Sequence, residues 1–177
     1  MRGMLALSLF LSSLNAADPV VSGVPVGKRP GPYGFLVATG PQKGQQTCYI
    51  CEQEKKPTVV VFCRTLSNQL GTLMTELDAD ATTHAEKGLK VWMTQLTEKA
   101  DLDSLSKWSR KQGLKSIPVG AFEDVDGPPA YKLHAEADVT VMVFVNEKVK
   151  LNMACRAKEL TADGIRDVRK AVAEVVK

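Results

Sequence analysis

The stretch TVVVFC at residues 58–63 sets the fold class of this chain. Pro57 introduces it, and it contains no charged residue and no apolar–polar alternation. A strand with one face in water alternates apolar and polar side chains, whereas a continuous apolar run is typical of a central strand covered on both faces. Residues 139–145, VTVMVFV, repeat the pattern and predict a second such strand.

Helical periodicity lies between and around these strands. Apolar side chains recur at helical spacing from Leu66 to Leu77, and residues able to cap a helix stand near the start of each helical segment. We expect helices at 66–77, at 101–112 and after Thr161, further strands at 89–94 and 117–122, and a helical turn at 130–133. Strands that alternate with helices indicate an α/β fold around a parallel core sheet.

An antiparallel hairpin is expected to finish this sheet near the C-terminus. Asn146-Glu147 is a plausible two-residue turn between the strand at 139–145 and the strand that follows. That second strand alternates cleanly between apolar and polar side chains. Its apolar face is predicted to consist of Val149, Leu151, Met153 and Cys155.

A second hairpin is expected near the N-terminus. Residues 35–39 form a short strand that Gly40-Pro41 closes, and a polar turn follows. The second half of this hairpin carries Cys48 and Cys51. The predicted architecture is thus a central mixed sheet flanked by helices, with an N-terminal β-hairpin extension.

The beginning of the chain has the features of a signal peptide. Arg2 supplies a positive charge, residues 4–14 form an apolar run too short to cross a bilayer, and Ala16-Ala17 offers a cleavage point. We expect residues 1–17 to be a signal peptide, 18–56 an extended leader with the cysteine-bearing hairpin, and 57–177 the main domain. The protein would then be secreted or periplasmic, with no membrane span after cleavage.

The charge balance narrows the range of partners. The 177 residues include 23 Lys and Arg against 20 Asp and Glu, a net charge of +3, and the two signs are mixed along the chain. This balance argues against nucleic acid or an anionic membrane surface as the main partner. No residue pattern calls for a cofactor.

The order of elements from Pro57 onward resembles the redoxin branch of the thioredoxin superfamily, which includes the alkyl hydroperoxide reductase and thiol-specific antioxidant proteins. The phrases that carry the resemblance are KPTVVVF, GLKVWMTQLTEKADLDSLSKWSRKQGL, PPAYKL and VTVMVFVNEKV. They correspond to the family's first core strand, its second strand and helix, a tyrosine-bearing turn and the closing hairpin. The resemblance implies a thioredoxin-like sandwich.

The resemblance also shows where this chain departs from the family. Redoxins carry their nucleophilic cysteine at the start of the helix after the first core strand, where the helix N-terminus stabilises a thiolate. Counted from Phe62, those positions fall on Ser67 and Leu70, and neither is a thiol. Val139-Thr140 stands where the family has a cis-proline followed by threonine. Ordinary redoxin catalysis at this helix is therefore not expected.

Cys48 and Cys51 have the spacing of a redox pair, C-x-x-C. One hypothesis is that this pair cycles between dithiol and disulfide, with Cys48 attacking or being attacked and Cys51 resolving. The other is a fixed disulfide that pins a turn. On a straight strand the two side chains would point to opposite faces, so a bond requires a turn or bulge at Tyr49-Ile50.

Two further cysteines have less specific interpretations. Cys63 ends the core strand near the family's active site, and Arg64 would lower its pKa if both faced solvent, so it is a second catalytic candidate. A buried cysteine at the strand end is the competing interpretation, and Cys155 is expected to be a buried, inert thiol. A four-cysteine zinc site would need all four thiols together, so no metal site is expected.

Two hypotheses for function follow. The first is an exported thiol–disulfide oxidoreductase that uses Cys48 and Cys51 on protein thiols or disulfides. The alternative is a non-catalytic redoxin-fold module that binds an unknown extracytoplasmic protein and keeps Cys48–Cys51 as a structural disulfide. A peroxidase that uses Cys63 is a third reading, but the threonine and arginine that such an enzyme needs are not in the right places.

Overall fold

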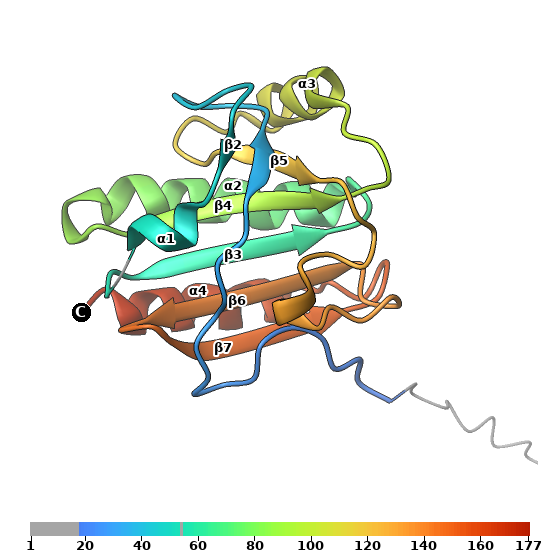
Figure 1. The fold of residues 1–177 in the computed structure, drawn as a ribbon. Helices are drawn as coiled ribbons and strands as arrows, with labels where there is room; N and C mark the ends of the chain where they lie inside the picture. The colour runs from blue at the N-terminus through green and yellow to red at the C-terminus, as the bar shows by residue number, and fades with distance from the viewer. Residues whose placement is uncertain (1–17, 54) are drawn as a thin grey trace, which may run out of the picture.

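A computed structural model describes residues 18–53 and 55–177. The expected signal peptide, residues 1–17, lies outside the described residues. Within them the chain forms one seven-stranded sheet with helices on its faces (Figure 1). The elements are β1 (Phe35–Val37), β2 (Gln46–Thr47), α1 (Tyr49–Gln53), β3 (Thr58–Cys63), α2 (Asn68–Thr83), η1 (Ala85–Lys87), β4 (Lys90–Leu96), α3 (Leu102–Gln112), β5 (Val119–Phe122), η2 (Pro129–Tyr131), β6 (Val139–Val145), β7 (Lys148–Cys155) and α4 (Ala162–Val175).

The strand order is β2-β1-β5-β4-β3-β6-β7, which confirms the predicted mixed α/β sheet. Strands β3, β4 and β5 run parallel, and β6 and β7 close one side as an antiparallel hairpin. In the turn between β6 and β7, Asn146 and Glu147 both have positive φ, 52° and 61°. This backbone conformation matches the twist of the flanking strands and explains how a turn without glycine is made here.

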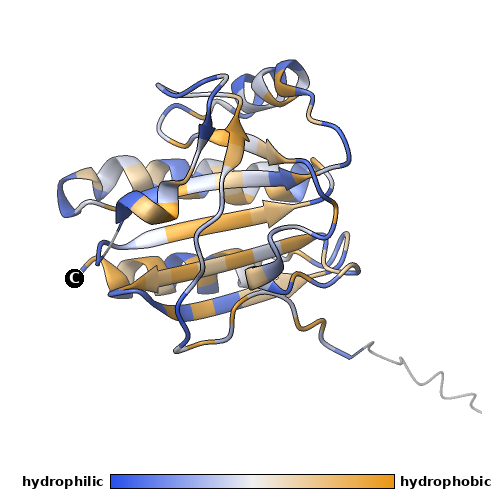
Figure 2. Cartoon of the chain, in the orientation of Figure 1, coloured by the Kyte–Doolittle hydropathy of each residue, from blue (hydrophilic) through white to orange (hydrophobic). Residues whose placement is uncertain are grey.

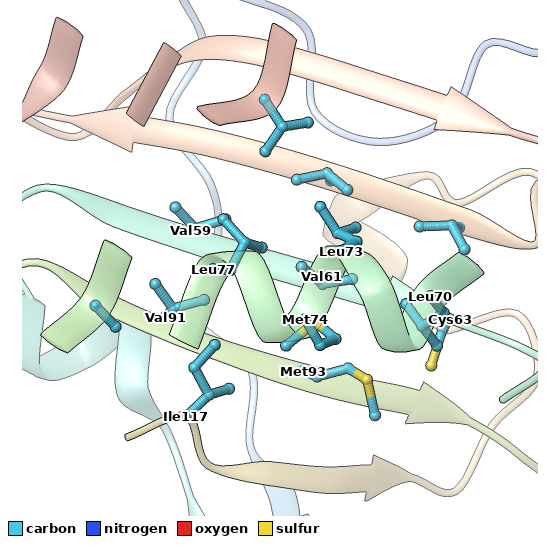
Figure 3. Packing of buried hydrophobic residues seen from close by; sticks show 14 of the residues in the cluster. Val59, Val61, Cys63, Leu70, Leu73, Met74, Leu77, Val91, Met93 and Ile117 are labelled. Atoms are coloured by element: carbon cyan, nitrogen blue, oxygen red, sulfur yellow. The ribbon is translucent and has the colours of Figure 1, made fainter. Parts of the chain in front are cut away.

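Strand β3 is covered on both faces, as its composition predicts. Val59, Val61 and Cys63 point into a core shared with α2 and α4, which Figure 3 shows from close by. Val60 and Phe62 point to the opposite face, into a second core rich in aromatic side chains. Figure 2 shows hydrophobic residues concentrated on the central strands, consistent with this two-sided burial.

The second core is covered by irregular chain rather than by long helices. The leader before β1 crosses this face of the sheet (Figure 1), where its Val24 and Tyr33 are buried. The hydroxyl of Tyr33 accepts a hydrogen bond from Trp92 Nε1 at 2.7 Å and shares another with the Thr94 hydroxyl at 2.9 Å. The extended leader expected before the hairpin is thus an integral cover of the core.

The N-terminal hairpin is confirmed, and it belongs to the main sheet. β1 pairs with β2 and also, antiparallel, with β5. The pairing brings the carbonyl of Leu36 so close to Gly120 that a Cβ there would lie 2.2 Å from the oxygen. Glycine at this position therefore permits the sheet to continue from β5 to β1.

One face assignment in β7 was wrong. Val149 packs in the aromatic core, whereas Leu151, Met153 and Cys155 lie on the helix-covered face. The cause is a register shift between Val143 and Phe144, where partners change from Leu151 to Val149 and Lys150 is the extra residue. A bulge of this kind reverses the alternation on one side of it.

The three predicted helices are confirmed, although α2 runs from Asn68 to Thr83 rather than over 66–77. The side chains of Ser67, Asp101 and Thr161 accept hydrogen bonds from the first turns of α2, α3 and α4. Gly113, with φ of 75°, ends α3 in the left-handed conformation. Among residues 18–53 and 55–177, no helix has the length and apolar character needed to cross a membrane.

Candidate functional site at the Cys48–Cys51 disulfide

Cys48 and Cys51 lie at a short helix, not on the second strand of the hairpin as expected. β2 ends at Thr47, Cys48 follows it, and α1 begins at Tyr49. The helical turn, in which the amide of Cys51 donates to the carbonyl of Cys48 at 3.2 Å, brings the two side chains to the same side. They form a disulfide with the Cα atoms 5.5 Å apart, a usual separation for such a bond.

Tyr49, between the two cysteines, anchors this helix to the sheet. Its ring is buried against Phe35 and Trp92, with centroid distances of 5.4 and 5.6 Å. Its hydroxyl donates to Gln42 Oε1 at 2.6 Å, and the ammonium of Lys90 lies 4.5 Å from the ring centroid. α1, which follows Cys48 and contains Cys51, thereby lies on the aromatic-core face of the sheet, close to the beginning of β3 (Figure 1).

The two sulfur-bearing residues differ in accessibility. Cys51 is exposed, whereas Cys48 is half-buried. Cys51 also lines a pocket of about 520 Å³, a volume within the range typical of ligand sites. The other lining residues are Arg29, Pro30, Gly31, Pro32, Ile50, Phe144 and Glu147.

The pocket combines three segments that are distant in sequence. The leader supplies residues 29–32, α1 supplies Ile50 and Cys51, and the end of the β6–β7 hairpin supplies Phe144 and Glu147. Arg29 and Glu147 form an ion pair at 2.7 Å. Sequence reasoning identified the cysteines but not these neighbours, because an apolar strand residue such as Phe144 carries no signal that distinguishes a pocket wall from core.

At the other end of β3, where redoxins carry their active site, Arg64 and Thr65 make a set of hydrogen bonds. The guanidinium of Arg64 donates to three carbonyls, those of Ala137 at 3.0 Å, His134 at 3.1 Å and Val125. The amide and hydroxyl of Thr65 donate to the carboxylate of Asp138 at 3.0 and 2.7 Å. These contacts tie the end of β3 to the segment that leads into β6.

The two positions that would carry thiols in a redoxin have structural roles here. Ser67 Oγ accepts from the amide of Leu70 at 3.1 Å and so caps α2, and Leu70 is fully buried in the core. The peptide bonds of the described residues are all trans, including the one before Val139. Given the length of β3, this end lies about 17 Å from the end that carries α1.

Cys63 is buried at the end of β3, 1 % exposed, and points into the core between β3 and α2 (Figure 3). Burial raises the pKa of its thiol far above the ordinary value, and the charge of Asp138 adds to the effect. Arg64, which would have lowered this pKa, directs its guanidinium to backbone carbonyls instead. The geometry favours the structural interpretation of Cys63 over a nucleophile.

Cys155 is also buried, and burial raises the pKa of its thiol to about 11, with Asp138 and Glu159 contributing. Cys63 and Cys155 both pair with Val139 from opposite sides, so they lie two strand spacings apart, about 9–10 Å. In the described part of the chain, no cluster of three or more His, Cys, Asp or Glu side chains is suited to a metal ion.

Comparison with known proteins places the fold. No protein-family model matches the chain, and no curated protein has significant sequence similarity to it. Among solved structures, a protein of Bacteroides thetaiotaomicron assigned as a protein disulfide isomerase superposes with a TM-score of 0.64 at 13% identity, over 86% of this chain and 93% of that one. A thiol:disulfide interchange protein of the thioredoxin family from Chlorobium tepidum gives 0.60 at 12% identity, over 87% and 99%. Peroxiredoxin Q of Xanthomonas campestris gives 0.57 at 14% identity, over 82% and 92%.

These similarities extend over most of each chain. The protein therefore has the thioredoxin-like fold, of the kind found in thiol:disulfide interchange proteins and peroxiredoxins. The resemblance deduced from KPTVVVF and the later phrases is confirmed at the level of fold. This chain has a C-x-x-C disulfide at the start of α1, and at the start of α2 it has Ser67 and Leu70 in place of the family's thiols.

Proposed function

We propose that the protein catalyses thiol–disulfide exchange through Cys48 and Cys51, with protein thiols and disulfides as its substrates. The observation that carries the proposal is that Cys51 is an exposed residue and lines a pocket. Exchange requires that a thiolate reach one sulfur of the disulfide. A disulfide with only a structural role has no need of an adjoining pocket.

The reaction balances in both directions. A substrate dithiol reduces the Cys48–Cys51 disulfide in two exchange steps, so the substrate gains a disulfide and the protein becomes a dithiol. A small disulfide such as oxidised glutathione then restores the Cys48–Cys51 bond and leaves as two thiols. With a reduced protein and a substrate disulfide the same steps run in reverse.

We further propose that this exchange takes place outside the cytoplasm, in a secreted or periplasmic protein. The positive residue, the short apolar run and the Ala16-Ala17 cleavage point support export. A disulfide persists in oxidising compartments and is rare where glutathione keeps thiols reduced. The division into 1–17 as signal peptide, 18–56 as leader and hairpin and 57–177 as main domain is part of the same proposal, with 18–56 completing the sheet and core of the main domain.

The alternative function is a redoxin-fold binding module with a structural disulfide. The start of α2 favours it, because the two positions that carry thiols in a redoxin are a capping Ser67 and a buried Leu70 here. The two functions differ in one property. A binding module needs the disulfide only to hold α1, so its Cys48–Cys51 bond would not exchange with the thiols of a protein substrate.

The test is catalysed oxidation of a reduced two-cysteine peptide, with oxidised glutathione as the terminal oxidant. We expect the protein to accelerate formation of the peptide disulfide, and we expect C48S/C51S to lose that acceleration entirely. C63A is the matched control, because Cys63 is a buried thiol remote from the pair, and it should keep the wild-type rate. A wild-type rate no higher than that of C48S/C51S would contradict the proposal and favour the binding module.

A further inference from the structure

We infer, resting on the proposed exchange function, that Cys51 is the sulfur to which the substrate becomes bonded, and that the pocket beside it binds an apolar polypeptide segment next to the substrate cysteine. The proposal concerns the pocket formed by residues 29–32, Ile50, Cys51, Phe144 and Glu147, here called the Cys51 pocket. It assigns the roles of the two cysteines in the reverse of the order expected from the sequence.

Accessibility decides which sulfur is attacked. A thiolate must approach one sulfur in line with the bond that breaks, so the sulfur in the open is the one that reacts. Cys51 is exposed and lines the pocket, whereas Cys48 is half-buried and is not among the lining residues. Cys48 stands directly before the anchored Tyr49, whose ring packs against Phe35 and Trp92.

The bonds in the proposed step are explicit. The substrate thiolate attacks Cys51 Sγ, the bond between Cys51 and Cys48 breaks, and Cys48 leaves as a thiolate. A second substrate thiolate then attacks the substrate sulfur of the mixed disulfide. The substrate disulfide forms, Cys51 is released as a thiolate, and protons from solvent complete the two protein thiols.

The walls of the pocket indicate the chemistry of the occupant. Phe144, Ile50 and two prolines provide apolar surface, and the prolines offer no backbone N–H donors. Arg29 and Glu147 neutralise each other at 2.7 Å, so the pocket presents no net charge to select a charged ligand. A volume of about 520 Å³ exceeds the space a lone cysteine needs. An uncharged polypeptide segment fits these properties better than a small charged thiol.

The test compares the two single-cysteine variants with a chromogenic probe. The probe is a short peptide with one cysteine flanked by leucines, whose sulfur carries a thionitrobenzoate group that absorbs light when it is released. C48A leaves Cys51 as the attacking thiol, and C51A leaves Cys48. We expect C48A to release the chromophore at least about 10-fold faster than C51A.

Occupancy of the pocket is tested with the same reaction. A serine-flanked peptide and glutathione, each carrying the same chromophore, serve as comparison probes. We expect C48A to react several-fold faster with the leucine peptide than with either comparison probe, and we expect C48A/I50D to lose this preference. Ile50 lines the pocket and is only half-buried, so an aspartate at this position changes the pocket wall.

Two outcomes would overturn the inference. A faster reaction of C51A would assign the mixed disulfide to Cys48, and equal rates of C48A with all three probes would remove the polypeptide site. Mapping the mixed disulfide on the wild-type protein by mass spectrometry, after partial exchange with the leucine peptide, guards against misfolding of either variant. Failure of the proposed exchange function would give a different result: the wild-type protein would not accelerate oxidation of the two-cysteine peptide, whatever the rates of these variants.

Discussion

Cys51 and Cys63 differ in surroundings rather than in chemistry. Cys51 is exposed at a pocket, whereas Cys63 is 1 % exposed in the core and its thiol pKa is raised by burial. The thiolate is the reactive species. Burial keeps reagents away from Cys63 and keeps its thiol protonated. We therefore expect the reactivity of each cysteine to depend on the exposure of its side chain.

Alkylation of the native protein tests this expectation. After mild reduction at neutral pH, iodoacetamide should modify Cys51 first and Cys48 more slowly, and it should leave Cys63 and Cys155 unmodified until the protein is unfolded. Mass spectrometry of proteolytic peptides measures each site separately. Modification of Cys63 at a rate comparable to Cys51 in the native state would contradict the assignment of Cys63 as structural.

The pH dependence of stability provides a second test at the residue scale. Burial raises the pKa of Cys155 from 9.0 to about 11, so the unfolded chain loses this proton at lower pH than the folded one. The resulting stabilisation is complete below about pH 9 and is lost as the pH rises through about 11. We expect C155A to lose less stability than the wild type between about pH 8 and about pH 10.5, measured by urea unfolding.

The comparison must be made as a difference between variant and wild type. Burial also raises the pKa values of Tyr33 and Tyr131, and their ionisation acts in the same direction. They are present in both proteins and cancel in the difference. Identical alkaline decline in C155A and wild type would show that Cys155 does not contribute.

At the scale of elements, the close approach of β1 to β5 holds the cysteine-bearing hairpin on the sheet. A Cβ at Gly120 would lie 2.2 Å from the carbonyl oxygen of Leu36 and 2.6 Å from the ring of Phe35. Both neighbours belong to β1, and the Phe35 ring also contacts Tyr49. A side chain at Gly120 should therefore displace Phe35, and through Phe35 it should disturb the packing of Tyr49 in α1.

We expect G120A to lower the free energy of unfolding by about 1–3 kcal/mol, because the added methyl group cannot be accommodated without moving β1. The measurement is equilibrium denaturation in urea. G34A is the matched control: the atoms nearest to a Cβ there belong to the flexible side chain of Gln46, the closest at 3.2 Å. Equal destabilisation by both substitutions would mean that the β1–β5 contact is not the cause.

Some of these elements could be predicted from the sequence and others could not. The continuous apolar runs at 58–63 and 139–145 predicted β3 and β6, because full burial leaves a compositional mark on every position. α1 was missed because its five residues are too short for a helical period to appear. The bulge at Lys150 was missed because the alternation there looks regular in sequence and changes face only through the register with β6.

The candidate site was only half predictable for a similar reason. The spacing of Cys48 and Cys51 is a local signal, and it correctly pointed to a disulfide-capable pair. The pocket walls come from the leader, α1 and the β6–β7 hairpin, which only the tertiary fold brings together. Neither Arg29 nor Phe144 has a sequence neighbour that would mark it as part of a site.

At the scale of the whole molecule, the disulfide lies outside the two cores that hold the fold together. One core joins β3, β4 and β6 to α2 and α4, and the other lies beneath the leader and α1. Cys48 and Cys51 close a very short loop, with a sequence separation of 3. A loop of this size constrains the unfolded chain by only about 2 kcal/mol.

We therefore expect the reduced protein to remain folded. Reduction should lower the free energy of unfolding by about 2 kcal/mol or less, with no change in the cooperativity of unfolding. Urea denaturation with and without a reductant such as dithiothreitol measures this, and C48S/C51S should behave like the reduced wild type. Loss of structure on reduction would indicate that the bond is structurally essential.

The measurement that tests the central claim most directly is the reduction potential of the Cys48–Cys51 disulfide in the purified protein. It is obtained by equilibration in graded glutathione buffers, followed by thiol trapping and mass spectrometry. The account predicts one reversible transition, assigned to Cys48 and Cys51, between about −120 and −270 mV, the range of known thiol–disulfide oxidoreductases. A bond that stays intact below about −300 mV, or thiols that never pair, would contradict it.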